Sequence, residues 1–156
     1  MNISQNGIDM IKSFEGLRLT CYKDSAGVKT IGYGHTGSDV YYGQKISQEE
    51  AETLLRADLA RFERHVNSYD KCYGWTQNEF DAMVSFAFNV GNITDLTYNG
   101  IRSKKMIADK MLLYCKAGSK RVSGLVTRRQ KERELFLKDD SPRIVNENIT
   151  SMKGRC

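Results

Sequence analysis

The sequence predicts a mostly helical α+β fold, in which a small β-hairpin lobe and a larger helical lobe are joined by a long helix. Strand-like alternation is confined to the stretch between residues 19 and 35, whereas helical spacing runs through most of the remainder. A length of 156 residues suits a single domain, and 40% hydrophobic with 28% charged residues is an ordinary globular composition. Disordered, collagen-like and disulfide-dense classes are therefore excluded.

The first expected elements are a helix and a hairpin. Ile3, Ile8 and Ile11 give an apolar stripe to a helix over about residues 4–14, and Gly16 is a typical residue just after a helix end. The chain continues with the turn composition KDSAG and then with the alternating run VKTIGYGH. This order predicts a β-hairpin.

Two capping boxes place the next two helices. Ser47 with Glu50 opens a helix of about twenty residues, which spans roughly 30 Å and can join two lobes. Thr76 with Glu79 opens a second helix that ends at Gly91. Its sequence is apolar on nearly all sides, which predicts the buried centre of the helical lobe.

The chain up to Lys138 is again helical in character, with breaks expected near residues 99–100, 117–118 and 123–124. Its last part, GLVTRRQKERELFL, is rich in charged residues. We interpret these as an ordinary solvated helix face, made of Arg128, Arg129, Lys131, Glu132, Arg133 and Glu134.

These elements predict one domain over residues 1–138. The hairpin lobe covers about residues 12–60, and the helical lobe covers about residues 68–138 with the first helix packed on it. Residues 139–156 are mostly polar and aperiodic, so we expect them to form a tail.

The net charge of +5 is unevenly distributed. Residues 1–78 carry 9 basic and 10 acidic groups, whereas residues 79–156 carry 15 and 9. A basic half favours an anionic partner, which can be a nucleic acid, a membrane surface or an acidic cell-wall glycan. We find neither an apolar run of the roughly 18 residues that a membrane span needs nor a start typical of a secretory signal. We therefore expect synthesis in the cytoplasm and no stable insertion into a membrane.

The cysteines do not indicate a metal site. The four of them lack zinc-type spacing, and the two histidines are too few to complete such a site. We expect no metal and no cofactor. Reduced thiols are the favoured interpretation, with one or more disulfides as the open alternative.

Glu15 interrupts the apolar pattern of the first helix. It lies four residues after Ile11 and seven after Ile8, and so on the same face. Either the end of the helix directs this carboxylate into solvent, or the residue is a placed acid. Periodicity alone favours the solvated alternative.

Asp24 and Thr30 extend the candidate site into the hairpin. An Asp in a turn needs no catalytic role, because it can bind its own backbone. Thr30 lies on the second strand, on the face expected to hold Gly32 and Gly34, and such glycines often mark the close approach of a ligand. Two carboxylates flanking a cleft are the minimum equipment for glycoside hydrolysis. His35 is interpreted as a hydrogen-bonded structural residue.

One run of the sequence resembles the N-terminal signature of the phage-type lysozymes, the endolysin muramidases of glycoside hydrolase family 24. This run is FEGLRLTCYKDSAGVKTIGYGHT. Glu15, Asp24 and Thr30 match the Glu–Asp–Thr triad of that family in type, order and spacing. The run WTQNEFDAMVSFAFNVG resembles the central helix of the helical lobe, and GLVTRRQKERELFL resembles the closing segment. The resemblance covers about residues 4–138 and outweighs the solvated alternative for Glu15.

The resemblance implies a lysozyme-like two-lobed fold and hydrolysis of the β-1,4 bond between N-acetylmuramic acid and N-acetylglucosamine in peptidoglycan. Glu15 would be the general acid, and Asp24 with Thr30 would hold the attacking water, which gives inversion. We expect Gly32, Tyr33 and Gly34 to contact substrate. The expected protein is a monomer that acts on the cell wall after release by a holin or a secretion apparatus.

Other classes of function remain as alternatives. A non-catalytic wall-binding relative would not need both acids and the threonine, and a secreted antibacterial effector would use the same chemistry in another setting. A nucleic-acid binder is suggested only by the pI of about 9.0 and the basic half, without any recognisable nucleic-acid motif.

Overall fold

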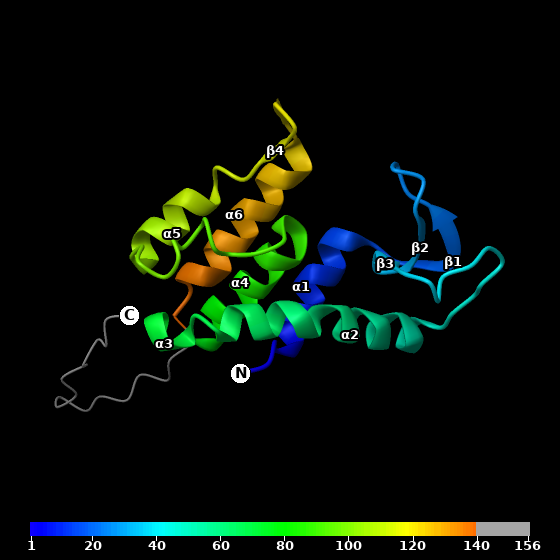
Figure 1. The fold of residues 1–156 in the computed structure, drawn as a ribbon, viewed down its shortest axis with the longest axis horizontal. Coiled ribbons are helices and arrows are strands. Elements are labelled where there is room, and N and C mark those ends of the chain that lie inside the picture. Colours follow the sequence, from blue (N-terminus) through cyan, green and yellow to red (C-terminus); the bar gives the residue numbers. More distant parts are fainter. Residues whose placement is uncertain (140–156) are drawn as a thin grey trace. The chain divides into compact units, whose positions relative to one another are not determined.

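The computed structural model describes residues 1–139. In chain order, its elements are α1 (Gln5–Glu15), β1 (Arg18–Lys23), β2 (Lys29–Gly32), β3 (His35–Thr36), α2 (Gln48–Asn67), α3 (Asp70–Tyr73), α4 (Gln77–Val90), α5 (Lys104–Met111), β4 (Lys116–Ala117), β5 (Lys120–Arg121) and α6 (Ser123–Leu137). They include one three-stranded sheet in the order β1-β2-β3 and one two-stranded sheet, β4-β5 (Figure 1). The α+β, mostly helical prediction is confirmed.

The chain divides into two compact units. The sheet unit consists of Ile8–Arg61, and the helical unit consists of Met1–Gly7 together with the described residues from Phe62 onward. Both boundaries fall inside helices, so α1 and α2 each contribute residues to both units.

The sheet unit contains the expected hairpin and a third strand. β1 pairs antiparallel with β2, with Tyr22 opposite Thr30, and β2 pairs antiparallel with β3, with Ile31 opposite His35. The expectation of one continuous strand from residue 28 to residue 35 is wrong. Gly32 and Gly34 have φ values of 67° and 83°, in a region that favours glycine, and the chain reverses there.

The apolar stripe predicted for α1 is confirmed. Ile8 and Ile11 are fully buried, as are Leu55 and Leu59 of α2 and Ile31 of β2. The start of α2 is also as predicted: the Ser47 hydroxyl accepts a hydrogen bond from the Glu50 N–H at 3.1 Å and donates one to the Glu50 carboxylate. Lys12 of α1 forms an ion pair with Glu52 of α2. These contacts stabilise α1 and α2, the two helices that support the three-stranded sheet.

The helical unit is built around α4, which packs against α6. Nine consecutive residues of α4, from Glu79 to Ala87, are buried, which confirms it as the centre of this unit. The capping box of Thr76 and Glu79 and the end of the helix at Gly91 are also as predicted. Phe80, Phe86 and Trp75 are core residues, and the Trp75 indole donates a hydrogen bond to the backbone oxygen of Val66.

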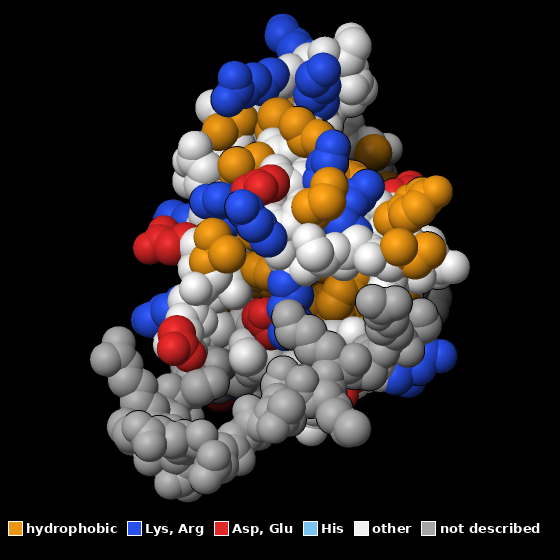
Figure 2. Space-filling view, turned by 90° about the vertical axis from the view of Figure 1, so that its left-hand side faces the viewer, with side chains coloured by type: hydrophobic (Ala, Val, Ile, Leu, Met, Phe, Trp, Pro, Cys, Tyr) orange, Lys and Arg blue, Asp and Glu red, His pale blue; other side chains and the backbone are white. Residues whose placement is uncertain are grey.

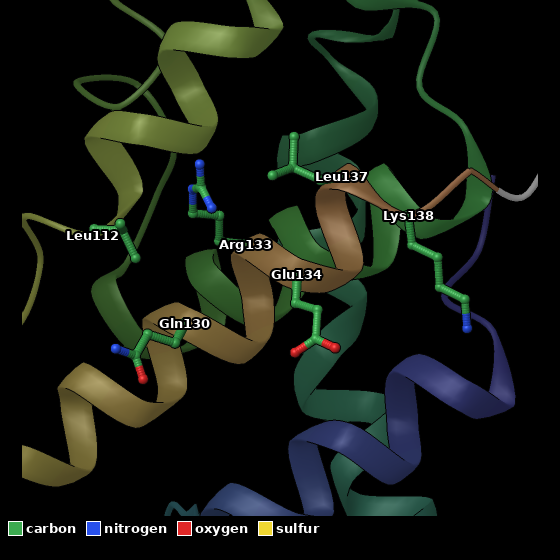
Figure 3. Close-up of a pocket in the computed structure, with 6 residues that line it drawn as sticks. All are labelled: Leu112, Gln130, Arg133, Glu134, Leu137 and Lys138. Carbon is green, nitrogen blue, oxygen red and sulfur yellow. The ribbon is translucent and has the colours of Figure 1, made fainter.

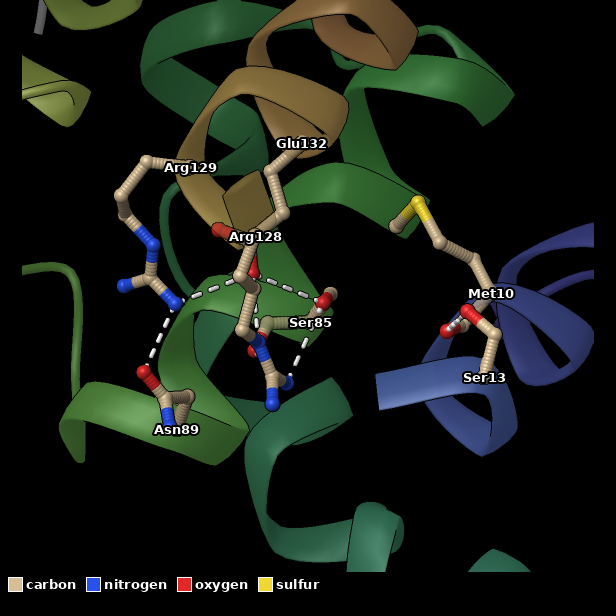
Figure 4. Close-up of polar contacts among 7 residues, drawn as sticks. All are labelled: Met10, Ser13, Ser85, Asn89, Arg128, Arg129 and Glu132. Atoms are coloured by element: carbon tan, nitrogen blue, oxygen red, sulfur yellow. Dashed lines mark hydrogen bonds and ion pairs between the residues drawn. The ribbon is translucent and has the colours of Figure 1, made fainter. Parts of the chain in front are cut away.

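The interpretation of α6 as an ordinary solvated face is wrong for three of its residues. Arg128, Arg129 and Glu132 are buried, and one oxygen of Glu132 accepts hydrogen bonds from both guanidinium groups and from the Ser85 hydroxyl of α4 (Figure 4). Arg129 also donates to the Asn89 side chain at 2.7 Å. The cause is helical spacing, because these three residues share the inward face of α6 with its buried Leu135 and Phe136.

Other details of the helical unit differ from the prediction. The short helix α3 and the small sheet β4-β5 were not expected, and Ser123 and Gly124 begin α6 instead of interrupting a helix. Cys21 and Cys115 are free thiols, whereas Cys72 is disulfide-bonded, so the favoured interpretation of reduced thiols is wrong for Cys72. The predicted tail lies outside the described residues, apart from its first. Among the described residues, no helix is both long and apolar enough to cross a membrane.

Candidate active site

Glu15 is the last residue of α1, and a glycine ends the helix directly after it. Gly16 has a φ of 70°, and its N–H donates to the backbone oxygen of Lys12 at 3.1 Å, which closes the last turn. The Glu15 side chain is partly buried. Its Oε2 lies 3.5 Å from the position that a Cβ on Gly34 would occupy. The helix end therefore places this carboxylate against the turn between β2 and β3.

Asp24 lies in the turn between β1 and β2, where its own backbone environment holds it. Its Oδ1 accepts hydrogen bonds from the N–H groups of Ala26 at 2.9 Å and Val28 at 2.8 Å. Its backbone N–H donates to the oxygen of Val28, and its backbone oxygen accepts from Gly27. No donor from residues 1–139 reaches the other carboxylate oxygen, Oδ2. One oxygen thus fixes the turn, and the other can accept a hydrogen bond from a further partner.

Thr30 is tied to the same turn. It is buried within β2, and its hydroxyl donates to the backbone oxygen of Val28 at 2.9 Å. Asp24 and Thr30 are therefore both anchored on Val28, one through its N–H and the other through its carbonyl. The hydroxyl oxygen of Thr30 retains lone pairs that can accept a further hydrogen bond.

The three residues expected to contact substrate have different surroundings. Gly34 lies beside the Glu15 carboxylate, as described above. A Cβ on Gly32 would lie 3.4 Å from the Cβ of Ala51, so this glycine permits close packing of β2 on α2. Tyr33 is buried, and the Lys12 ammonium lies 5.6 Å from the centre of its ring. Contact of Gly32, Tyr33 and Gly34 with substrate stays a prediction.

His35 connects the sheet to α2, as expected of a structural residue. Its Nδ1 lies 2.8 Å from an Asp58 carboxylate oxygen, and its Nε2 lies 2.9 Å from an oxygen of Asp39. Burial lowers the pKa of His35, but the hydrogen bonds and charges of the two aspartates outweigh this and raise it above the ordinary value. Through these two hydrogen bonds, His35 holds β3 in place next to the turn that carries Gly34.

The contacts that hold these residues in position could not be predicted from the sequence. The pairs formed by His35 with Asp58 and by Lys12 with Glu52 join residues 23 and 40 positions apart, so no local pattern announces them. Within the described part of the chain, no group of three or more His, Cys, Asp or Glu side chains is arranged to hold a metal ion.

Comparison with known proteins gives a consistent result. The Phage lysozyme family matches residues 12–132. The endolysin of Bacillus phage B103 is 47% identical over 94% of this chain, and the endolysin of Salmonella phage P22 is 40% identical over 88% of it. These matches cover 99% of the P22 relative but only 58% of the B103 relative, so the chain spans little more than half the length of the latter.

Solved structures agree with the sequence matches. The endolysin from Escherichia coli O157:H7 phage FAHEc1 is 39% identical, with a TM-score of 0.77 over 91% of this chain and 97% of that one. The predicted lysozyme-like fold is thereby confirmed. The family match covers well over half of the chain and includes Glu15, Asp24 and Thr30. This chain belongs to the phage lysozyme family.

Proposed function

We propose that this chain is a peptidoglycan hydrolase that cleaves the β-1,4 bond between N-acetylmuramic acid and N-acetylglucosamine. Its family membership and the endolysin names of its relatives support this activity. One observation carries the proposal: within one compact unit, a helix-end carboxylate lies against Gly34, and a turn carboxylate keeps one oxygen without a donor from the described chain.

Glu15 is the general acid in this mechanism. It transfers a proton to the glycosidic oxygen as the bond to the anomeric carbon breaks, so the departing sugar leaves as a neutral alcohol. A position at the end of a helix and beside a glycine suits this role, because no side chain at residue 34 separates the carboxyl group from the incoming sugar.

Asp24 is the general base. Its Oδ1 is committed to the turn, so Oδ2 accepts a proton from the attacking water on the opposite face of the sugar. The Thr30 oxygen orients that water, since its own hydrogen is directed to Val28. Attack by water from the face opposite the leaving group inverts the anomeric carbon. Inverting enzymes keep their two carboxyl groups about 6.5–9.5 Å apart to admit this water.

The first test is the release of new reducing ends from purified peptidoglycan. Glu15→Gln removes the proton donor with little change in volume, and we expect a loss of about 10²- to 10⁴-fold in turnover. Asp24→Asn keeps an oxygen that can accept the two turn hydrogen bonds, so it removes the base while preserving the turn. The matched control is Glu49→Gln, at an exposed acid in the first turn of α2.

The outcomes separate the alternatives. Loss in both site variants, with the control at wild-type turnover, supports the assignment. Near-normal turnover by Glu15→Gln rules it out as the acid. Fragments without reducing ends indicate a lyase, and binding without release by any variant indicates a wall-binding relative.

Thr30 has its own test, the anomeric configuration of the first product followed by NMR. Thr30→Glu fills the proposed water position with a carboxylate, so we expect impaired formation of the inverted product. Full activity with inverted product would show that Thr30 does not hold the water.

The setting of the reaction follows from the substrate. We expect the protein to act on the cell wall as a monomer, after a holin or a secretion apparatus gives it access. Lysis of producing cells only after their membrane is permeabilised would support this, whereas lysis without any permeabilising partner would contradict it.

The substitution Gly34→Ala is expected to lower turnover, because the new side chain would contact Glu15 and the φ of 83° at residue 34 disfavours a side chain.

A further inference from the structure

Exposed apolar side chains are concentrated in one stretch of the helical unit, from residue 98 to residue 122, which we call the basic–apolar segment. Thirteen large hydrophobic residues are exposed among those that the structure describes, and six of them lie in this segment of 25 residues. The six are Tyr98, Ile101, Met106, Leu112, Leu113 and Val122. Ile101 is 74% exposed and Leu113 is 65% exposed. Single exposed apolar residues are common, so the informative feature is their concentration in one stretch.

The exposure of Met106 follows from how α5 packs. Ile107, Ala108 and Met111 share one side of the helix and are buried, so the opposite side carries Lys105 and Met106 outward. Figure 2 shows the face of the helical unit on the left-hand side of Figure 1, where α5 lies, and hydrophobic and basic side chains alternate over it. A groove of about 700 Å³ between the end of α5 and α6 extends this surface, with Leu112 and Leu137 on its walls (Figure 3).

The same segment is strongly basic. It contains seven Lys and Arg residues and one acid, Asp109, which already pairs with Arg133 of α6 at 3.2 Å. Lys104 pairs with Glu79, and Arg102 donates to backbone oxygens of its own loop. Within residues 1–139, the other five form no ion pair: Lys105, Lys110, Lys116, Lys120 and Arg121.

We propose that the basic–apolar segment binds peripherally to anionic lipid membranes. The combination of groups favours this partner, because Ile, Leu and Met side chains need an apolar phase and lysines can extend from it to the phosphate layer. A soluble phosphate polymer offers the charge but no apolar phase. Because this surface lies in the helical unit and uses none of Glu15, Asp24 and Thr30, its function is independent of the proposed hydrolysis.

The test is co-sedimentation of the full chain with vesicles, which contain no glycan. Vesicles of phosphatidylcholine alone are compared with vesicles containing about 30% phosphatidylglycerol at about 0.1 M salt. We expect binding only to the anionic vesicles. Lys105→Gln with Lys120→Gln should lower the partition coefficient about 25-fold, since each basic residue near such a surface contributes about fivefold.

The apolar contribution has a separate variant and matched controls. Ile101→Ser with Leu113→Ser should lower the partition coefficient at least about tenfold, because each side chain loses its apolar transfer energy. Leu19→Ser and Lys71→Gln change exposed residues outside the segment and should bind like the wild type. Circular dichroism should stay unchanged in all of them, because the altered side chains are exposed.

Four results would overturn the proposal. The first is equal binding to anionic and neutral vesicles, and the second is an equal loss of binding in the control variants. The third is wild-type binding by the double variant Ile101→Ser with Leu113→Ser. The fourth is a concentration-dependent dimer that the same double variant abolishes. Wild-type binding by that variant, together with competition by soluble polyphosphate, would assign the segment to a phosphate polymer. The dimer would assign it to a second copy of this chain.

Discussion

Loss of the Asp58 charge should destabilise the protein in a pH-dependent way. The Asp58 carboxylate accepts from His35 Nδ1 at 2.8 Å, and the two side chains are only 26% and 12% exposed. A hydrogen bond of this kind to a charged partner contributes about 1.5–3 kcal/mol, so Asp58→Asn should lower the free energy of unfolding by that amount at about pH 5.5. At about pH 9 the neutral imidazole still donates one N–H, and the loss should fall to about 0.5–1.5 kcal/mol.

The direction follows from linkage. The folded state raises the pKa of His35, so the stabilisation from its charged form is fully present below the ordinary histidine value of about 6.5. It disappears as the pH rises through the raised value. The assay is urea unfolding followed by the fluorescence of the single tryptophan, Trp75, at both pH values.

Asp39→Asn is the matched control, because Asp39 binds the other ring nitrogen of His35 but its side chain is 58% exposed. An exposed ion pair contributes about 0–1 kcal/mol, so this variant should lose less than Asp58→Asn at every pH. The reasoning is refuted if Asp58→Asn costs the same at both pH values, costs more at high pH, or costs less than the control.

Three further predictions concern the helical unit and the ends of its helices. Thr76→Ala removes the capping box of α4 and should lower the unfolding free energy by about 1 kcal/mol, and an unchanged urea midpoint would contradict this. Gly7→Ala should destabilise by about 1–3 kcal/mol, because its Cβ would lie 2.8 Å from the Asp81 Cγ, whereas Gly124→Ala meets nothing within 4 Å and should stabilise α6 by up to about 1 kcal/mol. If thermal unfolding ranks these two variants in the opposite order, the packing argument fails. His65 accepts a backbone N–H on Nε2, and burial lowers its pKa, so its NMR titration midpoint should lie below that of an unperturbed histidine. A midpoint above that value would refute this.

The main helices were predictable because their signals are local. Spacing of apolar residues located α1, and capping residues located the starts of α2 and α4 within one position. The candidate triad was a different case, since periodicity alone favoured a solvated Glu15. Only the combined order and spacing of three motifs identified it, and the family match extends over the same residues.

The remaining features depend on contacts that no local pattern contains. The strand following Thr30 was expected to continue, yet two glycines with positive φ reverse it and create β3. The charge-rich run in α6 was interpreted as a surface because charged residues are rarely buried unless they are paired. Within α6 the three charged residues pair with one another, but a further hydrogen-bond partner of Glu132, Ser85, lies 47 residues earlier in the chain and is not part of the local pattern.

Arg128, Arg129 and Glu132 form one buried cluster, so the effect of a mutation at one of these positions on stability depends on the other two. Removing Glu132 alone would leave two guanidinium groups buried without their shared acceptor, and breaking such a cluster typically costs about 3–5 kcal/mol. Replacing all members with apolar residues of similar size is often neutral or stabilising. Each single substitution therefore lowers the stability of the protein, whereas the complete replacement does not. Engineering or natural drift at this interface must therefore proceed in concerted steps, and site-by-site scans will report these positions as more rigidly required than they are.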